Sequence, residues 1–264
     1  MIIDSNAFTG HWPFRRLTFV GASGLASLMR RTGTELALVS PLAGAFYRDC
    51  LGALDEMLED PGWDPQTMRP VAMVNPAFPG WQKDLEVMAR DRGCIALRLL
   101  PNYHGYSLYD EGENGGLAVV GRAQELGLPV IVTFRMQDER SHHWHMLVES
   151  VAVDQVRFLM RQLPHGTYVL SNVWFHEVRA LKLEMEMVND SAWEISYKPP
   201  DRLVEDAVNE FGSKRLLYGS AAPLQYPECT ISVIQGAEVS EEVKSLIFGG
   251  NARRIFELGG LDAH

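Results

Sequence analysis

Cationic and imidazole side chains stand near the ends of several short apolar runs in this sequence. Arg98 lies inside one such run and His104 follows it, while Arg135 and Lys198 close two later runs. Arginine binds a carboxylate or phosphate through two parallel hydrogen bonds, so these cations predict a pocket for a small anion. An unperturbed imidazole titrates near pH ~6.5, which predicts His104 as the general acid-base group of that pocket.

Amide, imidazole and phenol side chains near the same run ends complete the predicted substrate-binding site. Besides the three cations, that site comprises Asn6, His11, Asn102, Tyr106 and Asn172. Two interpretations of His104 stay open, because it could act in catalysis or brace its own loop through Asn102 and Tyr106. Arg98 and Arg135 also have a structural alternative, which is pairing with Asp or Glu across adjacent strands.

The elements that would position these side chains form an alternating pattern. Eight short apolar runs rich in β-branched residues recur with amphipathic stretches between them, which is the pattern of parallel strands joined by crossover helices. The predicted strands lie within residues 1–8, 35–42, 69–76, 94–101, 128–135, 167–174, 192–198 and 215–223. Predicted helices lie within residues 48–60, 80–93, 115–127, 153–164, 176–188, 200–212 and 240–258.

This inventory of strands and helices predicts one α/β domain, residues 1–264, folded as a single (β/α)8 TIM barrel. No linker or low-complexity segment divides the chain. A doubly wound open sheet is the rival fold, but no Gly-x-Gly-x-x-Gly follows the first predicted strand. The reactive groups of a TIM barrel lie at the C-terminal ends of its strands, which is where the side chains named above are found.

The predicted strand ends contain no acidic residue and one good metal ligand, His104. A catalytic zinc site needs three protein ligands that converge on one point, with an open position for water. We therefore expect no bound metal and no other cofactor. His142, His143 and His145 follow the fifth predicted strand. His142 and His145 could face together on a helix at i, i+3, but no convergent third ligand is evident near that pair, so a surface or loop role is the preferred interpretation.

Several segments resemble the amidohydrolase-related family of TIM-barrel metal-dependent hydrolases. The resemblance covers nearly the whole chain and implies an amidohydrolase-like barrel. It rests on the opening "MIIDSNAFTGHWPFRRL", the central "LRLLPNYHGYSLYD", the run "LPVIVT", and the ending "LLYGSAAP" with "SEEVKSLIFGGNARRIFEL".

The resemblance also implies where a metal site would lie. In that family the first strand ends Asp-x-His-x-His, the fifth and sixth strands each end in His, and the eighth carries Asp in a Gly-Ser-Asp-x-Pro context. The matching positions here hold Asn6, Phe8, Thr133, Asn172 and Ala221. The resemblance therefore implies a divergent member that lacks the metal-binding residues. Loss of the whole set removes the repulsion and desolvation cost of an unoccupied ligand cluster.

Charge and cysteine usage restrict the partners and the compartment. The net charge of -10, from 34 acidic and 24 basic residues, argues against nucleic acid and against an anionic membrane surface. Cys50, Cys94 and Cys229 form no Cys-x-x-Cys pair, which is typical of a reducing cytoplasm. No signal sequence and no run of ~20 apolar residues is found, so we expect a cytoplasmic protein. The predicted partner is a small anionic molecule, and a homo-oligomer is left open.

The favoured function is a metal-independent hydrolase or decarboxylating lyase that acts on a small carboxylate-bearing molecule. A rival function is a catalytically inactive barrel that binds or scaffolds, with its old cleft plugged by Phe8, Trp12 and Trp174. His11 either lines the pocket mouth or stands beside that aromatic plug. A third alternative is a metal-dependent hydrolase whose ligands, such as His11, His104 and His143, come from loops.

Overall fold

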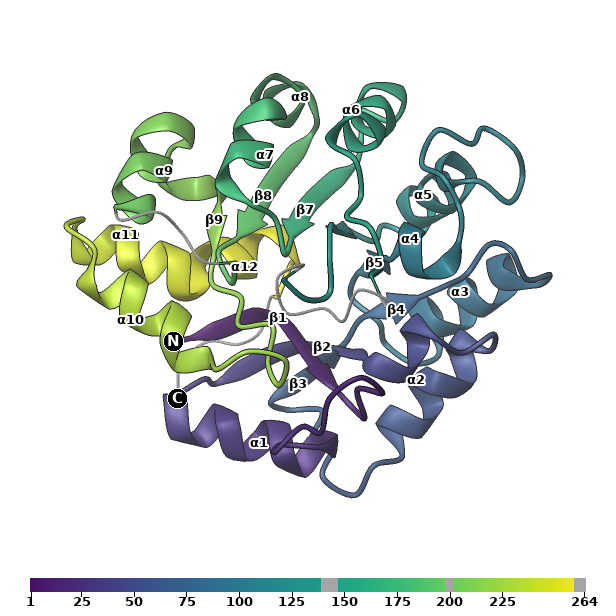
Figure 1. The fold of residues 1–264 in the computed structure, drawn as a ribbon, viewed down its shortest axis with the longest axis horizontal. Coiled ribbons are helices and arrows are strands. Elements are labelled where there is room, and N and C mark those ends of the chain that lie inside the picture. Colours follow the sequence, from purple (N-terminus) through teal and green to yellow (C-terminus); the bar gives the residue numbers. More distant parts are fainter. Residues whose placement is uncertain (139–146, 198–201, 259–264) are drawn as a thin grey trace.

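The computed structural model describes residues 1–138, 147–197 and 202–258, in which the strands occupy the middle and the helices form an outer ring (Figure 1). Every pair of neighbouring strands is parallel. Their order is β1-β2-β3 in one sheet and β4-β5-β6-β7-β8-β9 in the other. The strands are β1 (Ile3–Thr9), β2 (Leu36–Pro41), β3 (Met68–Pro70), β4 (Ala72–Met73), β5 (Leu97–Leu99), β6 (Val130–Thr133), β7 (Thr167–Ser171), β8 (Asp190–Glu194) and β9 (Leu216–Leu217).

Two joins close these sheets into a barrel. β3 and β4 belong to one predicted strand and are separated by Val71, whose N–H still donates to the Val39 carbonyl at 2.9 Å. On the opposite side the Phe8 N–H donates to the Ala222 carbonyl at 2.7 Å, which links β1 to the segment after β9. The chain therefore has the eight strand positions of a (β/α)8 barrel, and the predicted fold and all eight predicted strands are confirmed.

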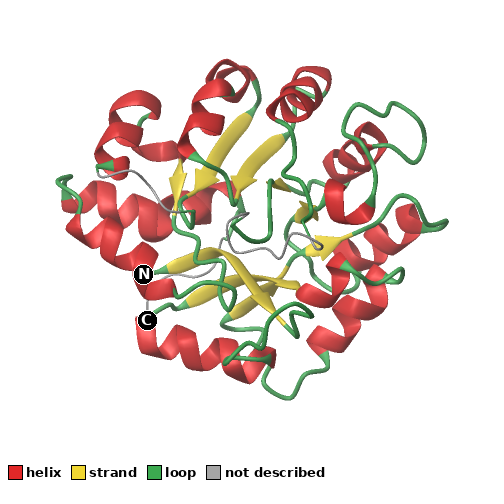
Figure 2. Cartoon of the chain, in the orientation of Figure 1, coloured by secondary structure: helices red, strands yellow, loops and turns green. Residues whose placement is uncertain are grey.

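The helices cover the outside of the barrel, as Figure 2 shows in red around the yellow strands. The predicted helices are confirmed, although residues 176–188 form two helices and residues 240–258 include a π-helical turn at Leu246–Gly250. No helix of the described residues is long and apolar enough to cross a membrane. The helices are α1 (Gly21–Thr32), α2 (Cys50–Leu58), α3 (Trp81–Arg90), α4 (Pro101–His104), α5 (Gly116–Glu125), α6 (Val153–Gln162), α7 (Phe175–Ala180), α8 (Lys182–Met187), α9 (Leu203–Phe211), α10 (Pro227–Gly236), α11 (Glu241–Ser245) and α12 (Asn251–Ile255).

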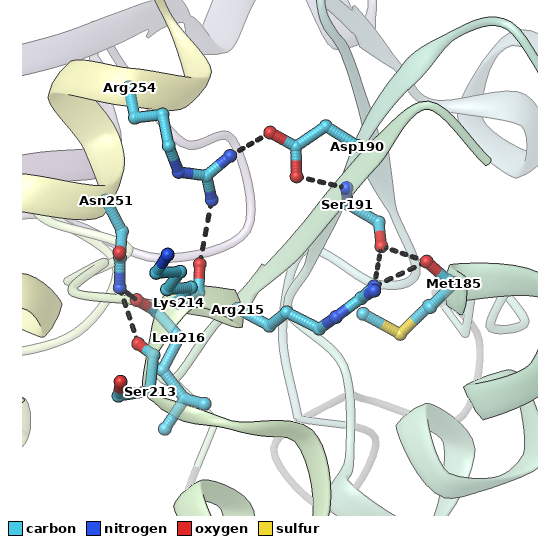
Figure 3. Close-up of polar contacts among 9 residues, drawn as sticks. All are labelled: Met185, Asp190, Ser191, Ser213, Lys214, Arg215, Leu216, Asn251 and Arg254. Atoms are coloured by element: carbon cyan, nitrogen blue, oxygen red, sulfur yellow. Dashed lines mark hydrogen bonds and ion pairs between the residues drawn. The ribbon is translucent and has the colours of Figure 1, made fainter. Parts of the chain in front are cut away.

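The closing segment "GGNARRIFEL" ties together the N-terminal ends of two strands (Figure 3). The Asn251 side-chain amide donates to the Leu216 carbonyl at 2.8 Å, at the start of β9. Arg254 pairs with Asp190, the first residue of β8, and donates to the Lys214 carbonyl at 2.8 Å. Polar contacts at this end of a TIM barrel stabilise the fold, while the opposite end carries the site. The residues of this segment therefore stabilise the closed barrel and lie at the end opposite the site.

Gly24 of α1 has no side chain, which lets the backbone of the preceding loop pass close to the helix. A Cβ atom at Gly24 would lie 2.8 Å from the carbonyl carbon of Phe19, and this neighbour is backbone that cannot swing away. Gly121 of α5 is a matched helical glycine, because nothing lies within 4 Å of the position of its Cβ.

We therefore expect opposite effects of the same substitution at the two glycines. Gly121→Ala should raise the free energy of unfolding by about 0.5–1 kcal/mol, because alanine favours the helix. Gly24→Ala should lower it by about 1–3 kcal/mol, because the clash outweighs that gain. Urea unfolding followed by circular dichroism measures both changes, and stabilisation of the protein by Gly24→Ala would contradict the close approach.

Candidate functional site

A fully buried carboxylate, Glu194, lies at the C-terminal end of β8. Its Oε1 atom accepts hydrogen bonds from the Asn6 amide at 3.0 Å, the Ser171 hydroxyl at 3.1 Å and the Ser196 hydroxyl at 3.0 Å. The Asn172 N–H also donates to Oε1, and the Ser196 N–H donates to Oε2 at 2.7 Å. Burial raises the pKa of Glu194, and these hydrogen bonds oppose that change.

The expectation that the strand ends carry no acidic residue is therefore wrong. It placed the end of the seventh predicted strand at Tyr197 and Lys198, whereas β8 ends three residues earlier, at Glu194. The signal in the sequence is a single Glu within the run "SAWEIS", whose neighbours are apolar or small. Charged residues are almost never fully buried unless they are paired, so such a Glu indicates a partner inside the barrel.

A buried cation, Arg98 of β5, shares this centre. Its Nε donates to the Ser40 hydroxyl at 2.7 Å and its Nη1 to the Thr133 hydroxyl at 2.9 Å. The Phe8 ring lies over the guanidinium, with its centroid 4.6 Å from Cζ. Nη1 also approaches the Ser171 hydroxyl at 3.4 Å, and that hydroxyl donates to Glu194. Ser171 thus connects the guanidinium to the carboxylate.

The charges of these two groups influence each other across the barrel. Burial lowers the pKa of Arg98 to about 10, while the carboxylates of Glu194 and Asp4 oppose that change. The guanidinium therefore remains protonated at neutral pH. The barrel centre holds a cation supplied by the chain itself.

A second buried carboxylate, Asp4 of β1, holds the segment after β9. Its Oδ1 accepts from the N–H groups of Asn6 at 3.1 Å and Ser220 at 2.9 Å, and its Oδ2 accepts from the Ser220 hydroxyl. Desolvation raises the pKa of Asp4 to about 6. Asp4 thus fixes Ser220 directly before Ala221, the residue at the family's aspartate position.

The positions at which the family binds metal do not suit a metal here. Asn6 turns its amide nitrogen toward the Asn172 side-chain oxygen, at 2.7 Å, and toward Glu194. Phe8 and Ala221 carry no donor atom, and Thr133 is engaged by Arg98. A second cation beside the buried guanidinium would be repelled in this low-dielectric space. The side chains at these positions are therefore arranged around Arg98.

An apolar cluster closes the mouth of the barrel above this centre. Arg98 and Glu194 have no exposed surface. A hollow of about 180 Å³ at the mouth is lined in part by Met136 and Leu224, which belong to the cluster. The cluster therefore separates the centre from this hollow. Its buried members are Phe8, Trp12, Leu17, Leu42, Ala45, Met73, Leu100, Met136, Ala221 and Leu224.

Arg135, a predicted anion-binding residue, has a carboxylate partner within the chain. Its Nη1 donates to Glu177 Oε2 at 2.9 Å, and its Nη2 pairs with Glu177 Oε1. Its Nε donates to the Ser150 hydroxyl at 2.8 Å, and its Nη1 also reaches the Asn172 carbonyl at 2.8 Å. Each guanidinium nitrogen therefore has a partner, as in the structural alternative of pairing with an acidic residue. That residue comes from helix α7 and not from an adjacent strand.

His104 lies at the end of α4 and is almost completely buried. Its Nε2 donates to the Gly44 carbonyl at 2.9 Å, and its ring stacks on Tyr106 with the centroids 6.4 Å apart. Burial lowers the pKa of His104, so the ring is neutral at pH 7. The neighbouring Asn102 amide donates to the Glu149 carbonyl. These contacts brace the loop after β5, and none of them joins His104 to the Arg98 and Glu194 network.

The remaining predicted residues that the structure describes lie in two places. His11 is exposed on the loop after β1, whereas Asn6 and Asn172 belong to the buried network. Lys198 lies outside the described residues, as do the three histidines between residues 139 and 146. Within the described ranges, no group of three or more His, Cys, Asp or Glu side chains could hold a metal ion.

The raised pKa of Asp4 predicts a pH dependence of stability. Asp4 has a pKa of about 6 in the folded state against 3.8 ordinarily, so the folded protein binds this proton more tightly. The free energy of unfolding should therefore fall as the pH rises from about 4 to about 6, by up to about 3 kcal/mol. Asp4→Asn should remove this part of the slope, because asparagine does not titrate. The contribution of Glu194 remains in both proteins and cancels in their difference.

Urea unfolding of the wild type and of Asp4→Asn at a series of pH values measures the difference. Glu113→Gln is the matched control, because Glu113 is exposed. Parallel curves for the wild type and Asp4→Asn would contradict the buried, proton-binding state of Asp4.

Several solved structures have this architecture. A putative amidohydrolase from Staphylococcus aureus aligns with a TM-score of 0.71 at 13% identity, covering 97% of this chain and 99% of its own. A 5-carboxyvanillate decarboxylase from Sphingomonas paucimobilis aligns with a TM-score of 0.67 at 14% identity, covering 97% and 98%. A 5-carboxyvanillate decarboxylase from Novosphingobium aromaticivorans, complexed with manganese, aligns with a TM-score of 0.70 at 12% identity, covering 97% and 96%. At these identities the likeness shows the shared fold.

The sequence itself is similar to a described family. No curated protein matches the chain. A family model described as "Amidohydrolase" matches residues 42–258, from the end of β2 to the end of the described chain. The match includes the strands that carry Arg98, Thr133, Ser171 and Glu194, and the closing segment with Asn251 and Arg254. The chain therefore belongs to the amidohydrolase family.

Proposed function

We propose that this chain is a non-catalytic amidohydrolase-fold barrel that acts as a binding or scaffolding protein. The observation that carries the proposal is the closed centre, in which Arg98 and Glu194 are completely buried beneath an apolar cluster. The three free cysteines suit a reducing compartment, so the proposal places the protein in the cytoplasm.

The chemistry of the centre supports this proposal. A general base needs an oxygen or nitrogen within hydrogen-bond reach of the proton that it removes. Glu194 already accepts hydrogen bonds on both oxygens, and the protons that it meets belong to the protein. Arg135 is paired with Glu177, and His104 hydrogen-bonds to the Gly44 carbonyl. The polar groups at the strand ends are thus directed toward one another.

A metal-independent hydrolase or decarboxylating lyase for a small carboxylate-bearing molecule is the second candidate. One atom favours it: Nη2 of Arg98 is buried and has no hydrogen-bond partner among the described residues. A carboxylate is a natural acceptor for that donor. Several proteins of similar fold are decarboxylases, including one complexed with 2,6-dihydroxybenzoate. In this candidate the apolar cluster must open to admit the substrate, and His104 supplies the acid-base group.

A turnover and binding experiment separates the two candidates. We expect that purified protein neither binds nor decarboxylates 2,6-dihydroxybenzoate or 5-carboxyvanillate, with or without added manganese, because the cluster covers Arg98. Calorimetric titration and carbon dioxide release are the measurements, with elemental analysis after incubation in zinc or manganese. Turnover that is lost in a folded Arg98→Met variant would favour the second candidate, and stoichiometric metal would contradict the proposed replacement of the metal.

The structural role of the centre predicts energetic coupling between its two charges. Arg98→Met should lower the free energy of unfolding at pH 7 by about 3–5 kcal/mol, because Glu194 is left without a cation. Adding Glu194→Gln should restore part of the loss, with a coupling energy of about 1–3 kcal/mol.

An exposed ion pair provides the matched control for this cycle. On the surface, Nε of Arg92 lies 2.7 Å from Oδ1 of Asp55. The cycle of Arg92→Met and Asp55→Asn should give only about 0.2–1 kcal/mol of coupling. Equal coupling in the two cycles, measured by urea unfolding, would contradict the role assigned to the two buried charges.

A further inference from the structure

We propose that the loop after β1 forms, with the loop after β2, a docking surface for an acidic segment of a partner protein. The inference rests on the binding role proposed above. The surface, called the mouth surface below, comprises His11, Phe14, Arg15, Arg16 and Phe46. It lies at the C-terminal end of the barrel, where the loops that follow the strands gather.

Exposed aromatic rings form the apolar part of the mouth surface. Phe14 is 42% exposed and Phe46 is 41% exposed, and their ring centroids lie 5.7 Å apart at 76°. Both rings pack on buried Trp12, and the centroid of the Trp12 ring lies 5.4 Å from that of Phe14 and 5.3 Å from that of Phe46. Trp12 belongs to the apolar cluster that closes the barrel, so it holds the exposed rings in place. Aromatic side chains that are fixed in advance lose little entropy on binding and are common interface anchors.

The charge of this region differs from that of the molecule. No Asp or Glu occurs between Ser5 and Thr34, while that stretch contains four arginines and one histidine in a protein of net charge -10. Arg31 of this stretch pairs with Glu228 at 2.5 Å. Arg15 donates instead to the Leu224 carbonyl, and no carboxylate of the described ranges pairs with Arg15 or Arg16. The arginines would therefore attract an anionic partner, and Asp138 is the acidic residue that lines a neighbouring hollow with Arg15.

Hollows beside these side chains give room for the side chains of a partner. One of about 630 Å³ is lined by His11, Phe14, Arg15 and Arg16. Another of about 140 Å³ adjoins Arg15, Arg16 and Tyr226, whose ring is 64% exposed. Because two hollows meet at the arginines, the surface suits an extended segment with apolar side chains among its carboxylates. The net charge of the protein opposes the phosphate backbone of a nucleic acid and an anionic membrane.

Fluorescence anisotropy with a labelled peptide tests the inference. The probe is a fluorescein-labelled peptide of Glu and Asp that contains one Phe and one Leu, and its control replaces each acid with Gln or Asn. We expect saturable binding of the acidic peptide that weakens with salt, and weaker binding of the amide peptide. Arg16→Glu should weaken binding by about tenfold or more, because it puts a like charge against the peptide.

Arg30→Glu is the matched control, because Arg30 is exposed, belongs to the same acid-free stretch and lies on α1, outside the mouth surface. It changes the net charge equally and should leave the affinity unchanged. Phe14→Ser should also weaken binding, and thermal unfolding verifies that each variant is folded. Absence of saturable binding, equal binding of both peptides or equal losses in Arg16→Glu and Arg30→Glu would overturn the inference. Binding to phosphatidylserine vesicles without binding to the peptide would also overturn it.

The outcome is separable from that of the proposed function. A protein that lacks turnover and fails to bind the acidic peptide loses only this docking surface. Decarboxylation that depends on Arg98 removes the non-catalytic proposal, whatever the peptide does.

Discussion

A guanidinium and a carboxylate buried in the same barrel centre constrain the residues around them. Removing both charges from water costs several kcal/mol for each ion, and their attraction offsets this cost only if hydrogen bonds satisfy the remaining atoms. Small hydroxyl groups on β2, β6 and β7 meet Arg98, while amide and hydroxyl donors meet Glu194. The ring of Phe8 also contacts the guanidinium, because its face attracts the cation. The residues at the family's metal positions thus form a consistent set around a cation that belongs to the chain.

The sequence indicates the barrel clearly, because strands that are buried on both faces appear as continuous apolar runs. Continuous apolar runs also lack an alternation of polar and apolar residues. The sequence therefore does not indicate which side chains point into the centre of the barrel. The sequence does not identify Glu194 as a strand-end residue, because the predicted strand continues to Lys198, whereas the hydrogen-bonded ladder ends earlier. The partner of Arg135 could not be predicted from spacing, because Glu177 is 42 residues away and comes from a helix. Arg98 was identified, but its hydroxyl partners depend on the register of three strands.

The N-terminal end of the barrel carries contacts that stabilise the fold, and the C-terminal end carries the candidate site. Asn251 and Arg254 fix the beginnings of β8 and β9 through contacts that do not involve the mouth (Figure 3). His104 has a comparable role nearer the mouth, because its bond to Gly44 joins the loop after β5 to the loop after β2. The two resembling segments that contain His104 and Asn251 therefore make contacts that support the fold. The family match thus includes the segment that closes the barrel.

The buried network around Arg98 and Glu194 also limits which substitutions the centre tolerates. Replacing Phe8 by His would place an imidazole against Arg98, and replacing Ala221 by Asp would insert a carboxylate into an apolar cluster. Each of these single changes would place a polar or charged group among neighbours that now provide no partner for it. The buried network therefore restricts the substitutions that the centre tolerates, while the exposed loops of the barrel carry no comparable restriction.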